Sequence, residues 1–233
     1  MKFIIIYFSI LLPFITHGQS FFDEADKFFS TYVKHGLVDY RSIREEPASL
    51  HNLVRQIADL DLSNKRVTPS FMKSFYINAY NILVIKQVVE FYPIEGPLKV
   101  EGFFNSLRHE VMGQDLTLDQ LEKEILYEKF PDPRLHFVLV CAAKGCPSLA
   151  DFAYQPSTLE EQLAERTTKV LNSESFIQVN RSKVNVSEIF NWYQSDFGDI
   201  LTFLNRYRDK QLSSETVIDY YTYDWSLNDI NSK

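Results

Sequence analysis

The sequence is poor in the residues that build phosphate loops, metal sites and nucleic-acid interfaces. Only 7 glycines occur among 233 residues, and none falls in the spacing of a phosphate-binding or dinucleotide-binding loop. No HExxH motif and no CxxC pair is present, and the histidines are scattered, so no metal and no cofactor are predicted. Lysine and arginine form no cluster and the formal net charge is −7, so nucleic acid is not an expected partner.

The sequence also lacks features that would mark a boundary between two domains. The sequence shows no repeat, no low-complexity segment and no Gly/Ser-rich linker. Its 19 phenylalanines and 13 tyrosines favour a packed interior over disorder. We therefore predict a single globular domain over residues 19–233.

The first residues have the order of a secretory signal. Lys2 is followed by an apolar run from Phe3 to Ile15, and Gly18 precedes two polar residues. This order is typical of a cleavable signal peptide. A permanent anchor is disfavoured because the run is shorter than the ~20 apolar residues that span a bilayer. We expect cleavage near Gly18 and a soluble, secreted or periplasmic product with no stable membrane anchor.

Helical patterns dominate the first half. Apolar residues recur at helical spacing over 21–34, 48–60 and most clearly 69–91. Two capping boxes, Thr117 with Gln120 and Thr158 with Glu161, predict the starts of two further helices.

Strand patterns are fewer and come later. The buried apolar run 135–141 is the clearest, and weaker candidates are 107–112, 175–179, 183–186 and 217–227. This order predicts an α+β fold, in which a helical N-terminal half packs on a small central sheet that contains strand 135–141.

Two cysteines, Cys141 and Cys146, follow that predicted strand. Gly145 permits a turn and Pro147 favours a first helical position, so Cys146 would stand near a helix N-terminus, where a thiol pKa is lowered. The same spacing suits a disulfide, whose six-residue loop would stabilise the fold by about 2 kcal/mol. The sequence does not decide between three states of this pair: a structural disulfide, a reactive thiol, and two buried free cysteines.

A nucleophilic cysteine normally needs a histidine base. Along an extended strand, His136 and Cys141 would be separated by roughly 16 Å and would point to opposite faces, so a direct pair is not expected. His109 is the second candidate. Each histidine could equally be a hydrogen-bonded structural residue.

Asn78 and Asn81 are unusual because they share a face of an otherwise apolar helix. Their amides either bind backbone groups of neighbouring loops or orient a catalytic imidazole or a ligand. Asp224 and Trp225 belong to an aromatic stretch that is either core or the wall of a pocket. If these residues form one site, an asparagine side chain should lie within about 10 Å of Cys141 or Cys146.

Several motifs together resemble a known family. They are Phe75–Asn81, Leu118–Glu122, His136–Cys141 running into Gly145–Pro147, and Tyr223–Trp225. Over roughly residues 35–230 the chain resembles domain-of-unknown-function family 547. The resemblance matches Asn78, Asn81, His136, Cys141, Cys146 and Asp224 to family positions without assigning a role to any.

The resemblance also implies a type of chemistry. Some eukaryotic members of the family carry a glutaredoxin-like module, which points toward thiol or redox chemistry. One departure is Lys123, which stands where many members are expected to carry a histidine.

Two functions follow as hypotheses. The first is a non-catalytic envelope protein with a structural Cys141–Cys146 pair, which binds a small molecule or an envelope protein. Its binding residues would be Asn81, Cys141, His109, Asp224 and Trp225. The alternative is an extracytoplasmic thiol-dependent enzyme, with Cys146 as nucleophile, His136 or His109 as base and Asn78 as orienting amide.

Overall fold

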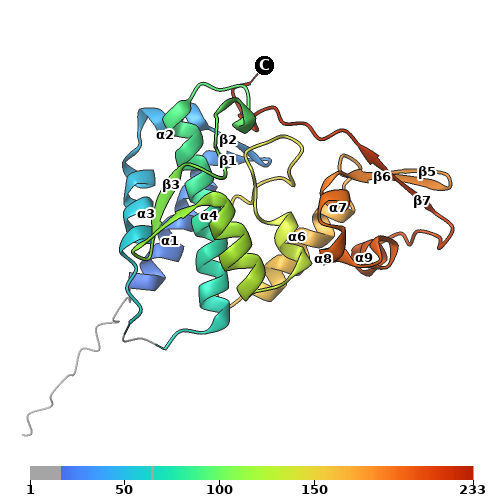
Figure 1. The fold of residues 1–233 in the computed structure, drawn as a ribbon, viewed down its shortest axis with the longest axis horizontal. Helices are drawn as coiled ribbons and strands as arrows, with labels where there is room; N and C mark the ends of the chain where they lie inside the picture. Colours follow the sequence, from blue (N-terminus) through green and yellow to red (C-terminus); the bar gives the residue numbers. More distant parts are fainter. Residues whose placement is uncertain (1–16, 64–65, 233) are drawn as a thin grey trace, which may run out of the picture.

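The structure, a computed structural model, describes residues 17–63 and 66–232. The predicted signal peptide, residues 1–18, lies outside the described residues except for its last two positions, which begin the first helix. In Figure 1 the helical first half occupies one end of the molecule and a smaller mixed unit the other. The helices of the first half are α1 (His17–Tyr32), α2 (Tyr40–Glu45), α3 (Ala48–Asp59) and α4 (Pro69–Phe91).

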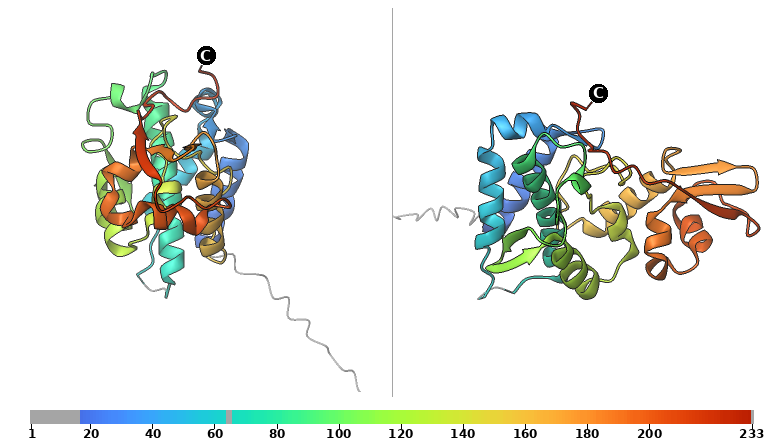
Figure 2. Two further views of the ribbon diagram at one scale, coloured as in Figure 1. Left: turned by 90° about the vertical axis from the view of Figure 1, so that its right-hand side faces the viewer. Right: turned by 45° about the horizontal axis from the view of Figure 1, so that its top comes forward.

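Helix α4 is the centre of the helical half and has the predicted bounds. The Thr68 side chain caps it, Pro69 occupies its first turn, and Tyr92 precedes Pro93, which cannot continue a helix. Most of its residues from Lys73 to Val88 are buried, because α2, α3 and the later helices pack around it (Figure 2). No helix of the described residues combines the length and apolar content that a membrane span requires.

The second half mixes short helices and strands. Its helical elements are the 3₁₀ helices η1 (Pro97–Lys99) and η3 (Pro133–Phe137), the π-helix η2 (Leu121–Tyr127), and α5 (Leu118–Gln120), α6 (Leu159–Leu171), α7 (Ile189–Trp192), α8 (Gln194–Phe197) and α9 (Ile200–Tyr207). The capping box of Thr117 and Gln120 is formed as predicted. The second predicted box is wrong: Thr158 precedes α6 but makes no side-chain capping bond.

The strands form three small sheets in the described residues. Two are hairpins, β1 (Val33–Lys34) with β2 (Leu37–Val38), and β3 (Arg108–Val111) with β4 (Gln114–Thr117). The third has the order β5 (Ile177–Asn180), β6 (Lys183–Ser187), β7 (Val217–Tyr221), with β6 and β7 parallel. The α+β class is confirmed. Strand β3 packs against α3 in the helical half, the three-stranded sheet lies at the other end of the molecule (Figure 1), and the described part of the chain has no central sheet.

The predicted central strand 135–141 is wrong. Its first residues belong to η3, which Pro133 begins and Asp132 caps, and residues 138–141 run without regular structure. The backbone groups of this apolar segment bond to a side chain instead of a neighbouring strand: Asn81 Nδ2 donates to Val138 O at 2.9 Å and Asn81 Oδ1 accepts from Val140 N at 2.9 Å. A short apolar run does not by itself distinguish a strand from a buried irregular segment. Here the segment needs no neighbouring strand, because the Asn81 side chain bonds its backbone.

Buried apolar side chains fall into two clusters. The first joins α1–α4 with η2 and the start of α6. The second is rich in phenylalanine and includes Phe137, Phe176, Phe190 and Phe203. Cys146 packs against both, so the two clusters meet at the cysteine loop.

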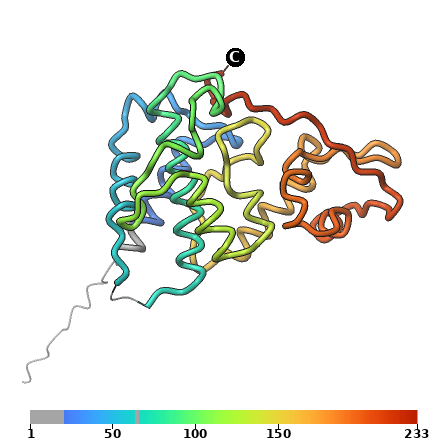
Figure 3. The backbone as a smooth tube through the Cα atoms, in the orientation of Figure 1, coloured from blue at the N-terminus to red at the C-terminus, as the bar shows by residue number. Residues whose placement is uncertain are grey.

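The C-terminal segment 222–229, called the strap below, ties the two clusters together. It leaves β7 and returns across the molecule to the helical half (Figure 3). Along this path Gly145 N donates to Asp224 O, Leu227 N to Glu95 O and Val38 N to Asn228 O, all at 2.8–2.9 Å. A side chain on Gly145 would meet Asp224 N at 2.8 Å, so the close approach of the strap requires glycine there. The predicted strand 217–227 is therefore correct only to Tyr221, where β7 ends.

Candidate functional site

Cys146 lines two hollows, and Cys141 lines one of them. Cys141 and Cys146 lie at disulfide distance, with their Cα atoms 6.5 Å apart. The Tyr223 hydroxyl lies 2.9 Å from Cys146 Sγ and 3.2 Å from Cys141 Sγ. Residues 146–150 form no helix, so the expected placement of Cys146 at a helix N-terminus is wrong. The lowering of its thiol pKa that was expected from such a helix has no basis in the structure.

The first hollow, called the aromatic hollow below, has a volume of about 130 Å³. It opens where the two clusters meet, and rings form most of its wall. Its lining residues are Tyr80, Phe104, Asp119, Glu122, Tyr127, His136, Leu139, Cys141, Cys146, Ile189, Trp192, Tyr193, Tyr223 and Trp225. Four of the residues selected from the sequence, His136, Cys141, Cys146 and Trp225, thus lie around one space.

His136 is buried and lines this hollow, and both of its ring nitrogens are bonded. Nδ1 lies 2.7 Å from the Tyr127 hydroxyl and Nε2 lies 2.8 Å from Asp196 Oδ2. Burial lowers the pKa of His136 below 6.5, while Asp196 opposes this effect. The predicted 16 Å separation from Cys141 assumed a strand; because η3 and an irregular segment replace it, both residues line the same hollow.

Two rows of rings flank the hollow. The His136 ring stacks on Tyr127 at 4.7 Å and contacts Tyr193 at 4.3 Å between centroids. On the strap side, Tyr223 lies 4.7 Å from Trp225 and 5.0 Å from Trp192. The second row comes from α7 and the strap, so elements distant in sequence build one wall.

The π-helix η2 brings a carboxylate to this wall. Glu122 Oε2 accepts a 2.8 Å hydrogen bond from the Tyr80 hydroxyl of α4. Burial raises the pKa of Glu122, Tyr80 lowers it, and the charge of Asp119 raises it. Its neighbour Lys123 is half exposed and forms a 3.0 Å ion pair with Asp119 Oδ2.

Burial and negative charge together raise the pKa of the tyrosines around the hollow. Tyr193 is raised to about 12 by burial and by Glu122, Asp119 and Asp196. Burial and then Glu122 also raise the pKa of Tyr80 and Tyr127. Burial is the largest cause at each of these tyrosines, and the neighbouring carboxylates add to it.

The two asparagines lie behind this site and do not line it. The amide of Asn81 binds the backbone of residues 138 and 140, directly before Cys141. The amide of Asn78 donates to Ser74 O and Tyr154 O, and its oxygen accepts from Tyr154 N. Their observed contacts are those of packing residues, and the bonds of Asn78 go to backbone, not to an imidazole.

His109 lies away from both cysteines. Its Nε2 is 2.7 Å from Gln87 Oε1, and it lines neither hollow beside the cysteine pair. Burial lowers its pKa to about 4, with a further contribution from Lys86. The structure does not bring His109 together with the other selected residues.

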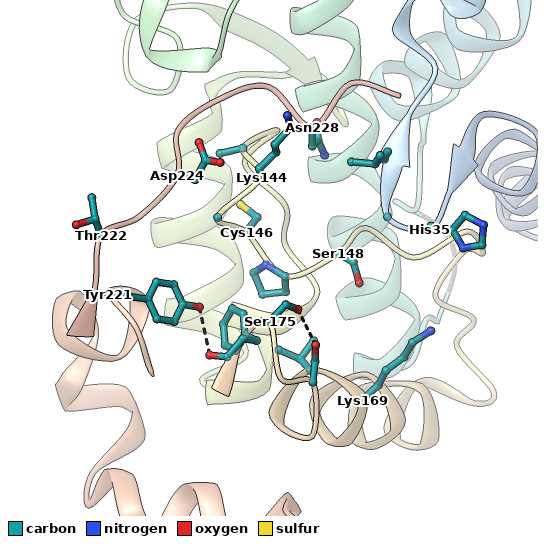
Figure 4. A pocket seen from close by; sticks show the side chains of 18 residues that line it. His35, Lys144, Cys146, Ser148, Lys169, Ser175, Tyr221, Thr222, Asp224 and Asn228 are labelled. Carbon is teal, nitrogen blue, oxygen red and sulfur yellow. Dashed lines mark hydrogen bonds between the residues drawn. The ribbon is translucent and has the colours of Figure 1, made fainter. Parts of the chain in front are cut away.

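The second hollow, called the serine groove below, is also lined by Cys146 (Figure 4). It measures about 430 Å³ and its wall carries both signs of charge, including Lys144, Lys169 and Asp224. The Asp224 carboxylate is exposed and accepts a hydrogen bond from Ser226 N at 2.9 Å. The Ser226 side chain and then this backbone bond lower the pKa of Asp224. Asp224 thus borders the serine groove, whereas Trp225 borders the aromatic hollow.

Sequence reasoning missed most of the aromatic hollow. Glu122, Tyr127, Trp192 and Tyr193 were not selected, although Glu122 follows a capping box and interrupts an apolar helical face. The π-helix that carries Glu122 and Tyr127 has no clear sequence signature, and such helices are often found at functional sites. Among the described residues no three metal-ligating side chains converge.

Comparison with known proteins yields one match. No curated protein and no solved structure matches the chain. Residues 65–171 match a family model described as a protein of unknown function, DUF547. This segment carries α4, Glu122, His136 and both cysteines, and it confirms the resemblance in the motifs from Phe75 to Pro147; the Tyr223–Trp225 motif lies outside the match. Over this segment the chain is similar to DUF547, a family of proteins of unknown function.

Proposed function

We propose that this protein is an extracytoplasmic ligand-binding domain, with Cys141–Cys146 as a structural staple and the aromatic hollow as its binding site. The observation that carries the proposal is the wall of the hollow, where eight rings, counting His136, surround two carboxylates and the cysteine pair. Pockets of this kind, mostly aromatic with a few placed polar groups, are typical of small-molecule sites.

The size of the hollow supports a small ligand or one group of a larger ligand. An engineered cavity of about 150 Å³ takes up a benzene molecule, so 130 Å³ accommodates a group of similar bulk. The serine groove is larger but has a mixed, hydroxyl-rich wall, which favours hydration. The aromatic hollow is therefore the stronger candidate.

A thiol-dependent enzyme is the alternative, and one observation favours it. Both cysteines are half-buried and line the aromatic hollow, and Cys146 also lines the serine groove, so a reductant or a thiol substrate could reach Cys146 from either hollow. Against this alternative, the His136 nitrogens already bond Tyr127 and Asp196, and a nucleophile needs a base within hydrogen-bond reach. We therefore place the binding function first.

The binding function is tested with a panel of small molecules. The panel contains amines, carboxylates, neutral sugars and neutral aromatics, and binding is read from tryptophan fluorescence. Both tryptophans of the chain, Trp192 and Trp225, line the hollow, so an occupant should change the signal. We expect at least one class to bind saturably.

A filled hollow provides the control. Leu139→Phe adds bulk to the wall of the hollow and should abolish binding, whereas Leu98→Phe, at an exposed position, should not. If no class binds, or if the Leu139→Phe protein binds as well as the natural one, the hollow is not a ligand site.

A further inference from the structure

We propose that the ligand of the aromatic hollow is a small organic cation, with a methylated ammonium group seated among the rings beside Glu122. This inference rests on the proposed binding function and specifies the chemical class of its ligand. It is carried by ring-lined walls together with an excess of carboxylates over cations in one small space.

The charges of the wall have one sign. Of the described residues that line the hollow, Asp119 and Glu122 are acidic and none is lysine or arginine. The nearest opposing cation, Lys123, is half exposed and bonded to Asp119. Asp196, which bonds His136 from behind, adds a third carboxylate to the surroundings. An anionic ligand would meet these groups without a partner.

Glu122 has one oxygen free for a ligand. Oε2 accepts from Tyr80, and among the described residues no hydrogen-bond donor contacts Oε1. A carboxylate that has lost part of its hydration is stabilised when a cation comes near. The pKa of Glu122 is raised first by its burial, and an approaching cation would oppose that effect.

The rings favour the same class of ligand. Trp192 and Trp225 stack at 6.0 Å between centroids, and Tyr193 and Tyr223 line the hollow with them. Cations are attracted to the faces of tryptophan and tyrosine, and boxes of such rings recognise quaternary ammonium groups. A trimethylammonium group is about as bulky as benzene, which matches the 130 Å³ available.

Three probes that share a head of three methyl groups and differ in charge test the inference by tryptophan fluorescence and calorimetry. They are choline, neopentyl carbinol, in which a carbon replaces the ammonium nitrogen, and pivalate, which is an anion. We expect choline to bind at least about tenfold more tightly than neopentyl carbinol, and pivalate not to bind.

Two variants show whether Glu122 supplies the selectivity. Glu122→Gln keeps the shape and an acceptor for Tyr80 but loses the charge, and it should weaken choline binding about tenfold while leaving neopentyl carbinol unchanged. Glu124→Gln makes the same change at an exposed position of η2 and should have no effect.

The outcomes separate the two proposals. If neopentyl carbinol or pivalate binds as tightly as choline, the cation inference is overturned while the hollow remains a binding site. If Glu122→Gln and Glu124→Gln behave alike toward choline, the inference is also overturned. If none of the three probes binds but another member of the panel does, the ligand class is wrong and the binding function stands.

Discussion

At Asn81 a single side chain takes over the hydrogen bonds that a neighbouring strand would supply. Its amide pairs with Val138 O and Val140 N and thereby holds the segment that connects His136 to Cys141. Both backbone groups are buried with it, and a buried backbone group without a partner is costly. Asn81 therefore fixes the wall of the aromatic hollow from behind.

Replacing Asn81 tests this role. Asn81→Leu keeps the approximate shape but leaves a donor and an acceptor unpaired, so we expect the free energy of unfolding to fall by about 2–5 kcal/mol. Urea unfolding measures the change. Asn105→Ala, at an exposed position, should cost less than about 0.5 kcal/mol; equal losses at both positions would contradict the proposed role of Asn81.

His109 makes stability depend on pH. Its pKa is about 4 in the folded protein, against 6.5 ordinarily, because burial disfavours the charged ring. The unfolded chain therefore binds more protons between these values, and stability falls as the pH drops from 6.5 to 4 by roughly 2–3 kcal/mol from this residue. The lowered pKa of His136 acts in the same direction.

Two variants isolate the His109 contribution. Urea unfolding of His109→Gln across pH 4 to 7 should show a shallower slope than the natural protein, whereas His51→Gln, at an exposed position, should leave the slope unchanged. Asp132, whose pKa is lowered to about 2 by Arg134 and Lys73 against burial, loses its contribution only below about pH 4. An unchanged slope in His109→Gln would show that this ring does not titrate as stated.

At the scale of elements, the sequence predicts the helices of the first half well, but it predicts residues 135–141, which lead into the aromatic hollow, poorly. Helix α4 has the predicted bounds because Thr68, Pro69 and Pro93 mark its ends locally. The mostly apolar run 135–141 favours a strand when it is considered alone. The side chain that bonds its backbone in place of a neighbouring strand, Asn81, lies more than fifty positions away in the sequence. The aromatic hollow was missed for the same reason: α4, η2, α7 and the strap each contribute a few residues, and only packing brings them together.

The cysteine loop gives a direct prediction at this scale. We expect Cys141 and Cys146 to be oxidised in the isolated protein, so that mass analysis after alkylation finds no modified thiol unless a reductant is added first. The double variant Cys141→Ala/Cys146→Ala should lose about 2 kcal/mol of stability, the value for closing a six-residue loop. Two alkylatable thiols in the untreated protein would favour the thiol-dependent alternative.

At the scale of the whole molecule, the two hydrophobic clusters are joined by the cysteine loop, by α6 and by the strap. We predicted a single domain from the sequence, and this connection leads us to expect that the clusters unfold together. Urea unfolding followed by tryptophan fluorescence reports on the hollow, whereas far-ultraviolet circular dichroism reports mainly on the helical half. Coincident curves are expected; two separate transitions would divide the chain into two folding units.

A ligand seated between the clusters should stabilise both of them. Hydrogen exchange measured with and without saturating choline tests this claim most directly, because exchange reports local opening along the whole chain. We predict slower amide exchange in residues 121–127 of the first cluster and in residues 189–193 beside the second. Unchanged exchange in both segments, or protection confined to residues outside the aromatic hollow, would contradict the account.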